Sequence, residues 1–247
     1  MITHRQKQIL DILKENKYEK ISEIAKKIYV SEATARRDVA ELKKLGLCGR
    51  DHGGAMYVDI NRDANIFVRR EKDTKDKLMT ANIAADKIPS FSSVFIDNSS
   101  SVLALCQMIK RKNIIAFTNG ITVAGELCKN EEIQVMLPMG QLRSGSNSIT
   151  GSQVTKWISD LRFDLFLGSC AAIDDSASYE TSSEQAEIKK AAFRNSSIRI
   201  LIVDKNKFLR SGTFKTSNLI EYDAIYTNAD DKTIKPLREK GINIINK

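Results

Sequence analysis

The sequence has few of the residues that build metal centres or disulfide scaffolds. Its 247 residues include two histidines, His4 and His52, and four cysteines. The cysteines lie far apart and form no C-x-x-C pair: Cys48, Cys106, Cys128 and Cys170. We therefore expect no metal site, no cofactor and no disulfide, and we interpret the cysteines as buried free thiols.

Long apolar segments are also missing. None approaches the ~18–20 residues that a helix needs to cross a bilayer, and residues 1–7 contain no apolar signal-peptide segment. A hydrophobic content of 42% with 28% charged residues is typical of a soluble globular protein. We expect a cytoplasmic protein without a membrane partner, long enough for one large or two ordinary domains.

Positive charge is concentrated at one end of the chain, whose net charge is +8. Residues 1–58 carry 12 Lys/Arg and 8 Asp/Glu, and the other 189 residues carry 27 and 23, so each part has a net charge of +4. The density of net positive charge is therefore about three times higher in the first quarter, which favours a nucleic-acid surface there.

The first quarter of the chain has the pattern of a helix-turn-helix. We expect a helix over residues 5–16, a second helix capped by Ser22, and a turn at residues 29–30. Ser31 is suited to cap a third helix, and Gly46 is suited to end it. The third helix would then enter the major groove of DNA.

A short hairpin follows the third helix and completes a winged helix-turn-helix. Residues 47–50 and 55–58 predict two strands, and residues 51–54 have the composition of the turn between them. Side chains on the third helix and the wing are expected to contact DNA: Ser31, Thr34, Arg36, Arg37, Lys44, Arg50 and His52. Arg36 and Arg37 have the reach for guanine edges or phosphates, although a solvated helix face is the alternative.

The rest of the chain alternates between strand-like and helix-like segments after a charge-rich linker at residues 59–75. Strands are expected at residues 93–96, 114–118, 133–138, 163–168, 198–204, 224–227 and 242–245. Helices are expected at residues 76–88, 102–110, 121–129, 153–160, 184–195 and 232–240. The alternation predicts an α/β domain over residues 76–247, with a largely parallel sheet covered on both faces.

Polar residues gather where the expected strands end, which is where open parallel sheets bind ligands. The run Asp97-Asn98-Ser99-Ser100-Ser101 leads from the first strand into a helix and suits a phosphate. A serine-rich helix cap without a ligand is an equally good interpretation of this run alone. Several polar strand ends together favour a small polar, anionic ligand.

The N-terminal motifs resemble those of DeoR-type bacterial transcription repressors: Val30-Ser31, Thr34-Ala35-Arg36-Arg37-Asp38 and His52-Gly53-Gly54-Ala55. The C-terminal part resembles the effector domain of that family, a Rossmann-like α/β fold related to ribose-5-phosphate isomerase. The resemblance covers nearly the whole chain. It implies a phosphorylated sugar or sugar alcohol as effector, and a homodimer or homotetramer bound to a double-stranded DNA operator.

The resemblance also implies a set of effector-binding residues. They are Asp97, Asn98, Ser99, Ser100, Ser101, Thr118, Asn119, Gly140, Glu187, Lys189 and Lys207. Two segments depart from the family pattern: Ser99 replaces a glycine, and residues 168–172 lack an aspartate and a glycine. The missing carboxylate counts against an isomerase, which needs a group for proton transfer there.

We interpret the protein as a repressor of a sugar-metabolism operon that a phosphorylated sugar releases, not as an enzyme. One alternative is a sugar-phosphate isomerase-like enzyme with a basic N-terminal domain. Asp97, Glu187, Lys189 and Lys207 are usable acid–base groups for such an enzyme. A second alternative is an activator or architectural DNA-binding protein whose ligand pocket is vestigial.

Overall fold

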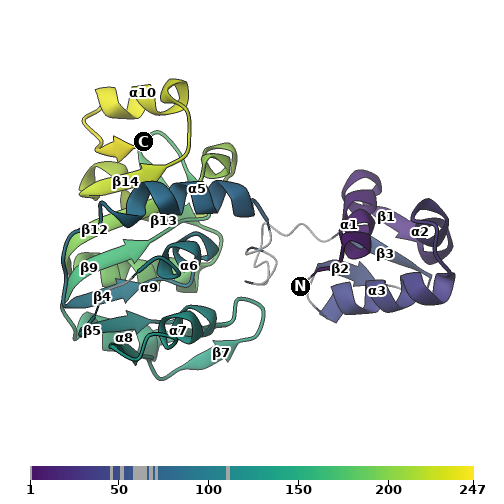
Figure 1. Cartoon of the computed structure of the whole chain (residues 1–247), viewed down its shortest axis with the longest axis horizontal. Coiled ribbons are helices and arrows are strands. Elements are labelled where there is room, and N and C mark those ends of the chain that lie inside the picture. The colour runs from purple at the N-terminus through teal and green to yellow at the C-terminus, as the bar shows by residue number, and fades with distance from the viewer. Residues whose placement is uncertain are drawn as a thin grey trace. The chain divides into compact units, whose positions relative to one another are not determined.

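The chain folds into two compact units, Met1–Lys72 and Asp73–Lys247 (Figure 1). The computed structural model describes residues 2–44, 47–50, 53–57, 66, 69, 72–109 and 112–247, except for the side chain of Arg50. Most of the predicted linker lies outside these residues. The division into residues 1–58, 59–75 and 76–247 therefore stays a prediction.

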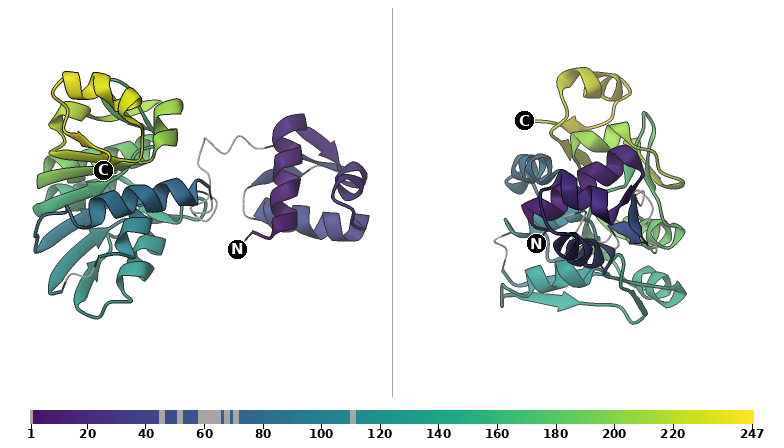
Figure 2. Two further views of the ribbon diagram at one scale, coloured as in Figure 1. Left: turned by 45° about the horizontal axis from the view of Figure 1, so that its top comes forward. Right: turned by 90° about the vertical axis from the view of Figure 1, so that its right-hand side faces the viewer.

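In the N-terminal unit the described residues form helices α1 to α3 and a small antiparallel sheet (Figure 2). The helices are α1 (His4–Asn16), α2 (Ile21–Lys27) and α3 (Glu32–Lys44). The strands are β1 (Tyr18–Lys20), β2 (Cys48–Arg50) and β3 (Gly54–Tyr57), in the order β1-β3-β2. The inward faces of all three helices meet in one core that includes Ile9, Leu13, Ile24, Val39 and Leu42. The predicted winged helix-turn-helix is confirmed.

The helix starts were predicted with mixed success. Ser31 caps α3, because its Oγ accepts a hydrogen bond of 3.2 Å from the backbone N–H of Thr34. The prediction that Ser22 caps α2 is wrong, because Lys20 ends β1 and runs directly into a helix that begins at Ile21. The predicted end of α3 at Gly46 and the wing turn at residues 51–52 lie outside the described residues.

The C-terminal unit is built on a seven-stranded sheet of order β15-β14-β12-β9-β4-β5-β6, in which every neighbouring pair is parallel. Its strands are β4 (Ser93–Ile96), β5 (Ile114–Thr118), β6 (Ile133–Met136), β9 (Phe163–Gly168), β12 (Ser196–Val203), β14 (Ala224–Thr227) and β15 (Ile244–Ile245). The helices around it are α5 (Thr74–Ala85), α6 (Ser100–Cys106), α7 (Ile121–Leu127), α8 (Ser152–Ser159), α9 (Ser183–Arg194) and α10 (Asp231–Glu239). The predicted α/β fold is confirmed.

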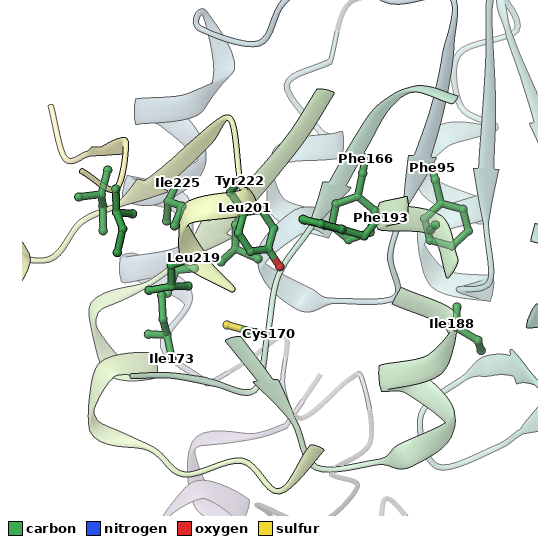
Figure 3. Packing of buried hydrophobic residues seen from close by; sticks show 14 of the residues in the cluster. Phe95, Phe166, Cys170, Ile173, Ile188, Phe193, Leu201, Leu219, Tyr222 and Ile225 are labelled. Carbon is green, nitrogen blue, oxygen red and sulfur yellow. The ribbon is translucent and has the colours of Figure 1, made fainter. Parts of the chain in front are cut away.

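Alternate residues of the central strands face opposite layers of the core. Val94 and Ile96 of β4 pack with α5, α6 and α7, whereas Phe95 between them packs with α8 and α9 on the other face. Phe95 pairs in register with Phe166 of β9, and their rings stack 6.3 Å apart (Figure 3). Both faces of the sheet are therefore apolar, which explains why the strands read as continuous hydrophobic runs.

Two smaller sheets of this unit were not predicted. One is antiparallel and contains β10 (Ala172–Ile173), β11 (Ala177–Glu180) and β13 (Phe214–Asn218). The other is the hairpin of β7 (Gln141–Arg143) and β8 (Ser148–Thr150). A short 3-10 helix, η1 (Lys205–Leu209), follows β12, and a second, η2 (Leu219–Glu221), follows β13.

The prediction that all four cysteines are buried is wrong for one of them. All four are free thiols, and Cys48, Cys106 and Cys170 are buried, but Cys128 is exposed directly after α7. Within the described residues, no group of three or more His, Cys, Asp or Glu side chains could hold a metal ion. Among the same residues, no helix is long and apolar enough to cross a bilayer.

Candidate functional site

The outer face of α3 presents the polar side chains predicted to contact DNA. The exposed side chains are Ser31, Arg36, Arg37 and Lys44, and Thr34 is half-buried. The hydroxyl oxygens of Ser31 and Thr34 lie 2.9 Å apart. The guanidinium of Arg36 is 3.3 Å from the carboxylate of Glu32, one turn earlier on the same helix. The predicted contacts of the Arg50 side chain and of His52 lie outside the described residues.

Asp38, the acidic residue of the Arg36-Arg37-Asp38 triplet, contacts another helix instead of facing solvent. Asp38 is buried and forms a two-pronged ion pair with Arg5 of α1, at 2.5 Å from Nε and 3.1 Å from Nη2. Gln6 of α1 also donates to Glu41 of α3 at 2.6 Å. These contacts fix α3 against α1 and leave the arginines directed outward, an arrangement that helical spacing alone did not reveal.

The second candidate site is the edge of the large sheet where its parallel strands end. The chain leaves β4 through α6 to β5 on one side, and leaves β9 through α9 to β12 on the other. The point between β4 and β9 is therefore a topological switch point, the usual ligand position in open α/β sheets. Buried polar residues follow four adjacent strands there: Asp97 after β4, Asn119 after β5, Ser169 after β9 and Asp204 after β12. We call these four residues the strand-end cluster.

Lys189 of α9 crosses the middle of this cluster. Its Nζ lies 2.7 Å from Asp97 Oδ2, 2.5 Å from Glu180 Oε1 of β11 and 2.5 Å from the carbonyl oxygen of Ser169. Burial alone would lower the pKa of Lys189, but the carboxylates of Asp97 and Glu180 together raise it above its ordinary value. Lys189 is thus a fixed cation that ties three elements together.

Three buried atoms of the strand-end cluster have no hydrogen-bond partner among the described residues. They are Asn119 Oδ1, Ser169 Oγ and Asp204 Oδ2. Buried oxygens are normally hydrogen-bonded, and leaving one unsatisfied costs about 1–3 kcal/mol. All three lie along one edge at the switch point, so this edge can accept hydrogen bonds from a polar group.

A second buried lysine lies beside the cluster at the β12 end. Lys207 of η1 is only 9% exposed. Burial lowers its pKa, although the carboxylate of Asp204 acts in the opposite direction. A cation in such surroundings is stabilised when a negative group comes within reach.

In the loop predicted to bind phosphate, residues 97–101, most side chains are buried or hydrogen-bonded within the protein. Ser99 caps α6 by accepting a 3.3 Å hydrogen bond from Val102 N–H, and its own N–H donates to Asp97 Oδ1 at 3.0 Å. Ser100 and Ser101 are buried. Asn98 donates from Nδ2 to the carbonyl oxygen of Ser146 at 2.8 Å.

The remaining predicted residues contribute unequally. Thr118 accepts a 3.1 Å hydrogen bond from the backbone N–H of Gly120 and so shapes the turn that leads to α7. Gly140 is required by packing, since a Cβ there would lie 2.8 Å from Ile149 and Val154 side-chain atoms. Both residues therefore shape the backbone beside the cluster.

Glu187 does not join the cluster, contrary to the sequence-based expectation. Its side chain is 60% exposed and pairs with Lys190 at 2.8 Å. Residues two apart on a helix point in different directions, so Glu187 and Lys189 cannot both face the sheet. Glu180 of the short strand β11 pairs with Lys189 instead, and a strand of four residues is too short to show a periodicity in the sequence.

Comparison with known proteins connects both sites to one kind of regulator. Residues 5–61 match the family model of the DeoR-like helix-turn-helix domain, and residues 72–229 match that of the DeoR C terminal sensor domain.

Among curated proteins, the chain is 30% identical to the glycerol-3-phosphate regulon repressor of Escherichia coli strain K12, covering 92% of this chain and 91% of that one. The HTH-type transcriptional repressor CsqR of the same strain is also 30% identical, with 91% and 87% covered. The L-fucose operon activator of that strain is 29% identical, with 91% and 94% covered. Among solved structures, ribose 5 phosphate isomerase A from Neisseria gonorrhoeae matches 53% of this chain and 52% of its own, at 12% identity and a TM-score of 0.40.

Proposed function

The chain belongs to the DeoR family of transcription regulators, and from that premise we propose that it represses a sugar-metabolism operon until a phosphorylated sugar or sugar alcohol binds the strand-end cluster. In this proposal α3 reads the operator. Relatives of the chain include an activator as well as repressors, so the direction of control is part of the proposal.

The observation that carries the proposal is the row of unsatisfied oxygens next to a buried cation. Asn119 Oδ1, Ser169 Oγ and Asp204 Oδ2 accept hydrogen bonds from ligand hydroxyls, and Lys207 attracts a negative group. A sugar or polyol that carries one phosphate has both kinds of group.

The spacing of the cluster also suits a small ligand. Asn119 and Asp204 follow strands that are three steps apart in the sheet, about 14 Å at the usual ~4.8 Å between strands. A ligand about 8 Å long that donates one hydrogen bond at each end would span this distance. Pentose and hexose phosphates are of that size.

The DNA side of the proposal rests on the exposed arginines of α3. Arg36 and Arg37 are exposed, Arg36 beside Glu32, and both can approach base edges and phosphates. Asp38 of the same triplet is held inward by Arg5. Operators for helix-turn-helix proteins are commonly palindromic, so we propose that a homodimer or homotetramer binds double-stranded DNA in the cytoplasm.

We further infer that the cluster binds its ligand without converting it. Lys189 is held between two carboxylates, and residues 168–172 carry no carboxylate of their own. A general base near neutral pH is therefore missing from that loop. Incubation with ribose 5-phosphate and related sugars is expected to give no isomerised product, and turnover would establish the isomerase alternative.

The proposed function is tested by measuring operator binding at fixed salt by fluorescence anisotropy. The protein–DNA complex is titrated with phosphorylated pentoses, hexoses and polyols. One compound of the panel is expected to release the DNA, while its unphosphorylated counterpart is not. Tight operator binding that no compound changes would leave a DNA-binding protein and contradict its control by a sugar phosphate.

A further inference from the structure

The residue at the start of α5, Asp73, does not cap its helix in the way that Asp230 caps α10. Its backbone is left-handed, with φ 56° and ψ 30°, and its side chain makes no capping hydrogen bond. Asp230 is extended, with φ −72° and ψ 161°, and accepts a 2.8 Å hydrogen bond from the N–H of Thr233. The extended conformation is the usual one for a capping residue, and aspartate is among the best of them. Asp73 is therefore held in an arrangement that its position in the helix does not require.

The contact that holds Asp73 is an ion pair with Arg210, the residue that ends η1. Nη2 of Arg210 lies 2.5 Å from Oδ2 of Asp73, and only 23% and 24% of the two side chains are accessible. Solvent and salt screen such a pair less than one on the open surface. The pair engages the carboxylate that would otherwise cap α5, and it accompanies a left-handed backbone that aspartate tolerates better than most residues.

Other residues of η1 also contact the first turn of α5. Asp76 in that turn accepts hydrogen bonds from Asn206 Nδ2 at 3.0 Å and from Asn228 Nδ2 at 2.8 Å. Lys205 Nζ lies 3.2 Å from Asp76 Oδ1, and the backbone N–H of Lys205 donates to Asn228 Oδ1 at 2.8 Å. The start of α5 is thus attached to η1 at several points, and a displacement of η1 reaches it directly.

The opposite end of η1 belongs to the strand-end cluster. Asp204 is the N-cap of η1, and its Oδ1 accepts a 3.1 Å hydrogen bond from the backbone N–H of Asn206. Its Oδ2 is one of the three buried oxygens without a partner among the described residues. A hydroxyl that donates to Oδ2 fixes the carboxylate that caps η1. The five residues of η1 extend about 10 Å at ~2 Å per residue, which separates this oxygen from the contacts at Arg210.

We propose that η1 couples the effector to α5. A ligand hydroxyl bound to Asp204 Oδ2 stabilises η1 and with it the pair between Arg210 and Asp73, whereas loss of the pair lets Asp73 cap α5 in the extended conformation. The two arrangements exclude each other, because one backbone conformation and one carboxylate serve both. The inference deepens the proposed function and rests on it.

The place of Asp73 in the chain gives the two arrangements a regulatory consequence. The C-terminal unit begins at Asp73, so its φ and ψ set the direction in which the preceding chain meets α5. A ligand shifts an equilibrium only through contacts that differ between its two states. The effector favours the paired arrangement through Asp204, and the capped arrangement is the one that accompanies operator binding.

Operator release by the full chain tests the inference. Glycerol 3-phosphate, ribose 5-phosphate and fructose 6-phosphate are each titrated into the operator complex at one salt concentration. Arg210→Met cannot pair with Asp73, so we expect it to bind the operator at least as tightly as wild type and to need at least about threefold more of the releasing compound. Asp73→Asn keeps a capping side chain but loses the ion pair, and it should change in the same direction.

A matched control removes an arginine that holds the first turn of a different helix. Arg238 pairs with Asp231, the first residue of α10, at 3.1 Å. Arg238→Met should therefore bind the operator and be released as wild type is.

The outcomes separate this inference from the function on which it rests. If wild type is released and both Arg210→Met and Asp73→Asn are released at the same concentration, coupling through η1 is overturned and the proposed function stands. Weaker operator binding by both variants without a sugar phosphate would also overturn it. A wild-type complex that none of the three compounds releases would contradict the proposed function, and the inference would fall with it. Misfolding of Arg210→Met does not leave the question open, because Asp73→Asn preserves the size and shape of the side chain.

Discussion

The two units place their polar groups in opposite ways. On α3 the arginines proposed to act are exposed, and the side chain of Arg36 remains 61% accessible despite its pair with Glu32. At the strand-end cluster Asp97 and Lys189 are almost completely buried, and three oxygens nearby have no partner among the described residues. A large partner can reach groups on a surface, whereas buried groups are reached only by a ligand small enough to enter.

The difference also separates function from stability. Exposed charges contribute little to folding, because water already solvates them. Buried charges and hydrogen bonds are part of the packed interior, and removing one partner leaves the other uncompensated. Substitutions in the two units should therefore change different quantities.

The largest effect is expected from Lys189→Met, which leaves the buried carboxylates of Asp97 and Glu180 without their cation. The free energy of unfolding should fall by about 3–5 kcal/mol. Urea unfolding monitored by the fluorescence of Trp157, the chain's one tryptophan, measures this free energy within the C-terminal unit. Lys190→Met, which removes only the pair with exposed Glu187, should cost less than about 1 kcal/mol. Equal losses of unfolding free energy in Lys189→Met and Lys190→Met would contradict the distinction between buried and exposed charges.

A smaller effect of a different kind is expected from Arg37→Ala on the surface of α3. Operator affinity should fall by about 1–3 kcal/mol if the guanidinium reads a base edge, with no change in unfolding. Gel shifts at one salt concentration measure this, and Arg162→Ala in the C-terminal unit is the matched control. Operator affinity that is unchanged in Arg37→Ala would exclude this residue from the contacts that read DNA.

The smallest effect compares one substitution in both units. Tyr222 is buried, and its hydroxyl lies 3.0 Å from Ser178 Oγ, so Tyr222→Phe should lower the free energy of unfolding by about 1 kcal/mol. Tyr29, in the turn before α3, is 94% exposed, and Tyr29→Phe should change it by less than about 0.5 kcal/mol. Thermal unfolding of both variants measures these changes. A larger loss of stability in Tyr29→Phe than in Tyr222→Phe would contradict the comparison.

Much of the fold could be predicted from the sequence because its main signals are local. The strands of the parallel sheet are continuous apolar runs, and β4, β5, β9 and β14 have the predicted bounds. Helices α1, α2 and α3 carry apolar residues at helical spacing. The strands β1 and β10 could not be predicted in this way, because two or three residues are too few to show a periodicity.

The candidate site was less predictable because it depends on contacts between distant segments. Polar residues after the strands pointed to Asp97, Asn119 and Lys207, all of which lie at one edge of the sheet. The pairing of Lys189 with Glu180 could not be predicted, since only the tertiary fold brings β11 beside α9.

The central claim is that the buried cluster of one unit controls the exposed surface of the other. Coupling between two sites is reciprocal, so operator DNA must weaken effector binding by the same factor by which the effector weakens operator binding. The direct measurement is the affinity of the full chain for the releasing sugar phosphate, with and without saturating operator DNA at one salt concentration. The account predicts weaker binding in the presence of DNA, by the factor seen in operator release. Equal affinities would contradict it, because the two units would then act independently.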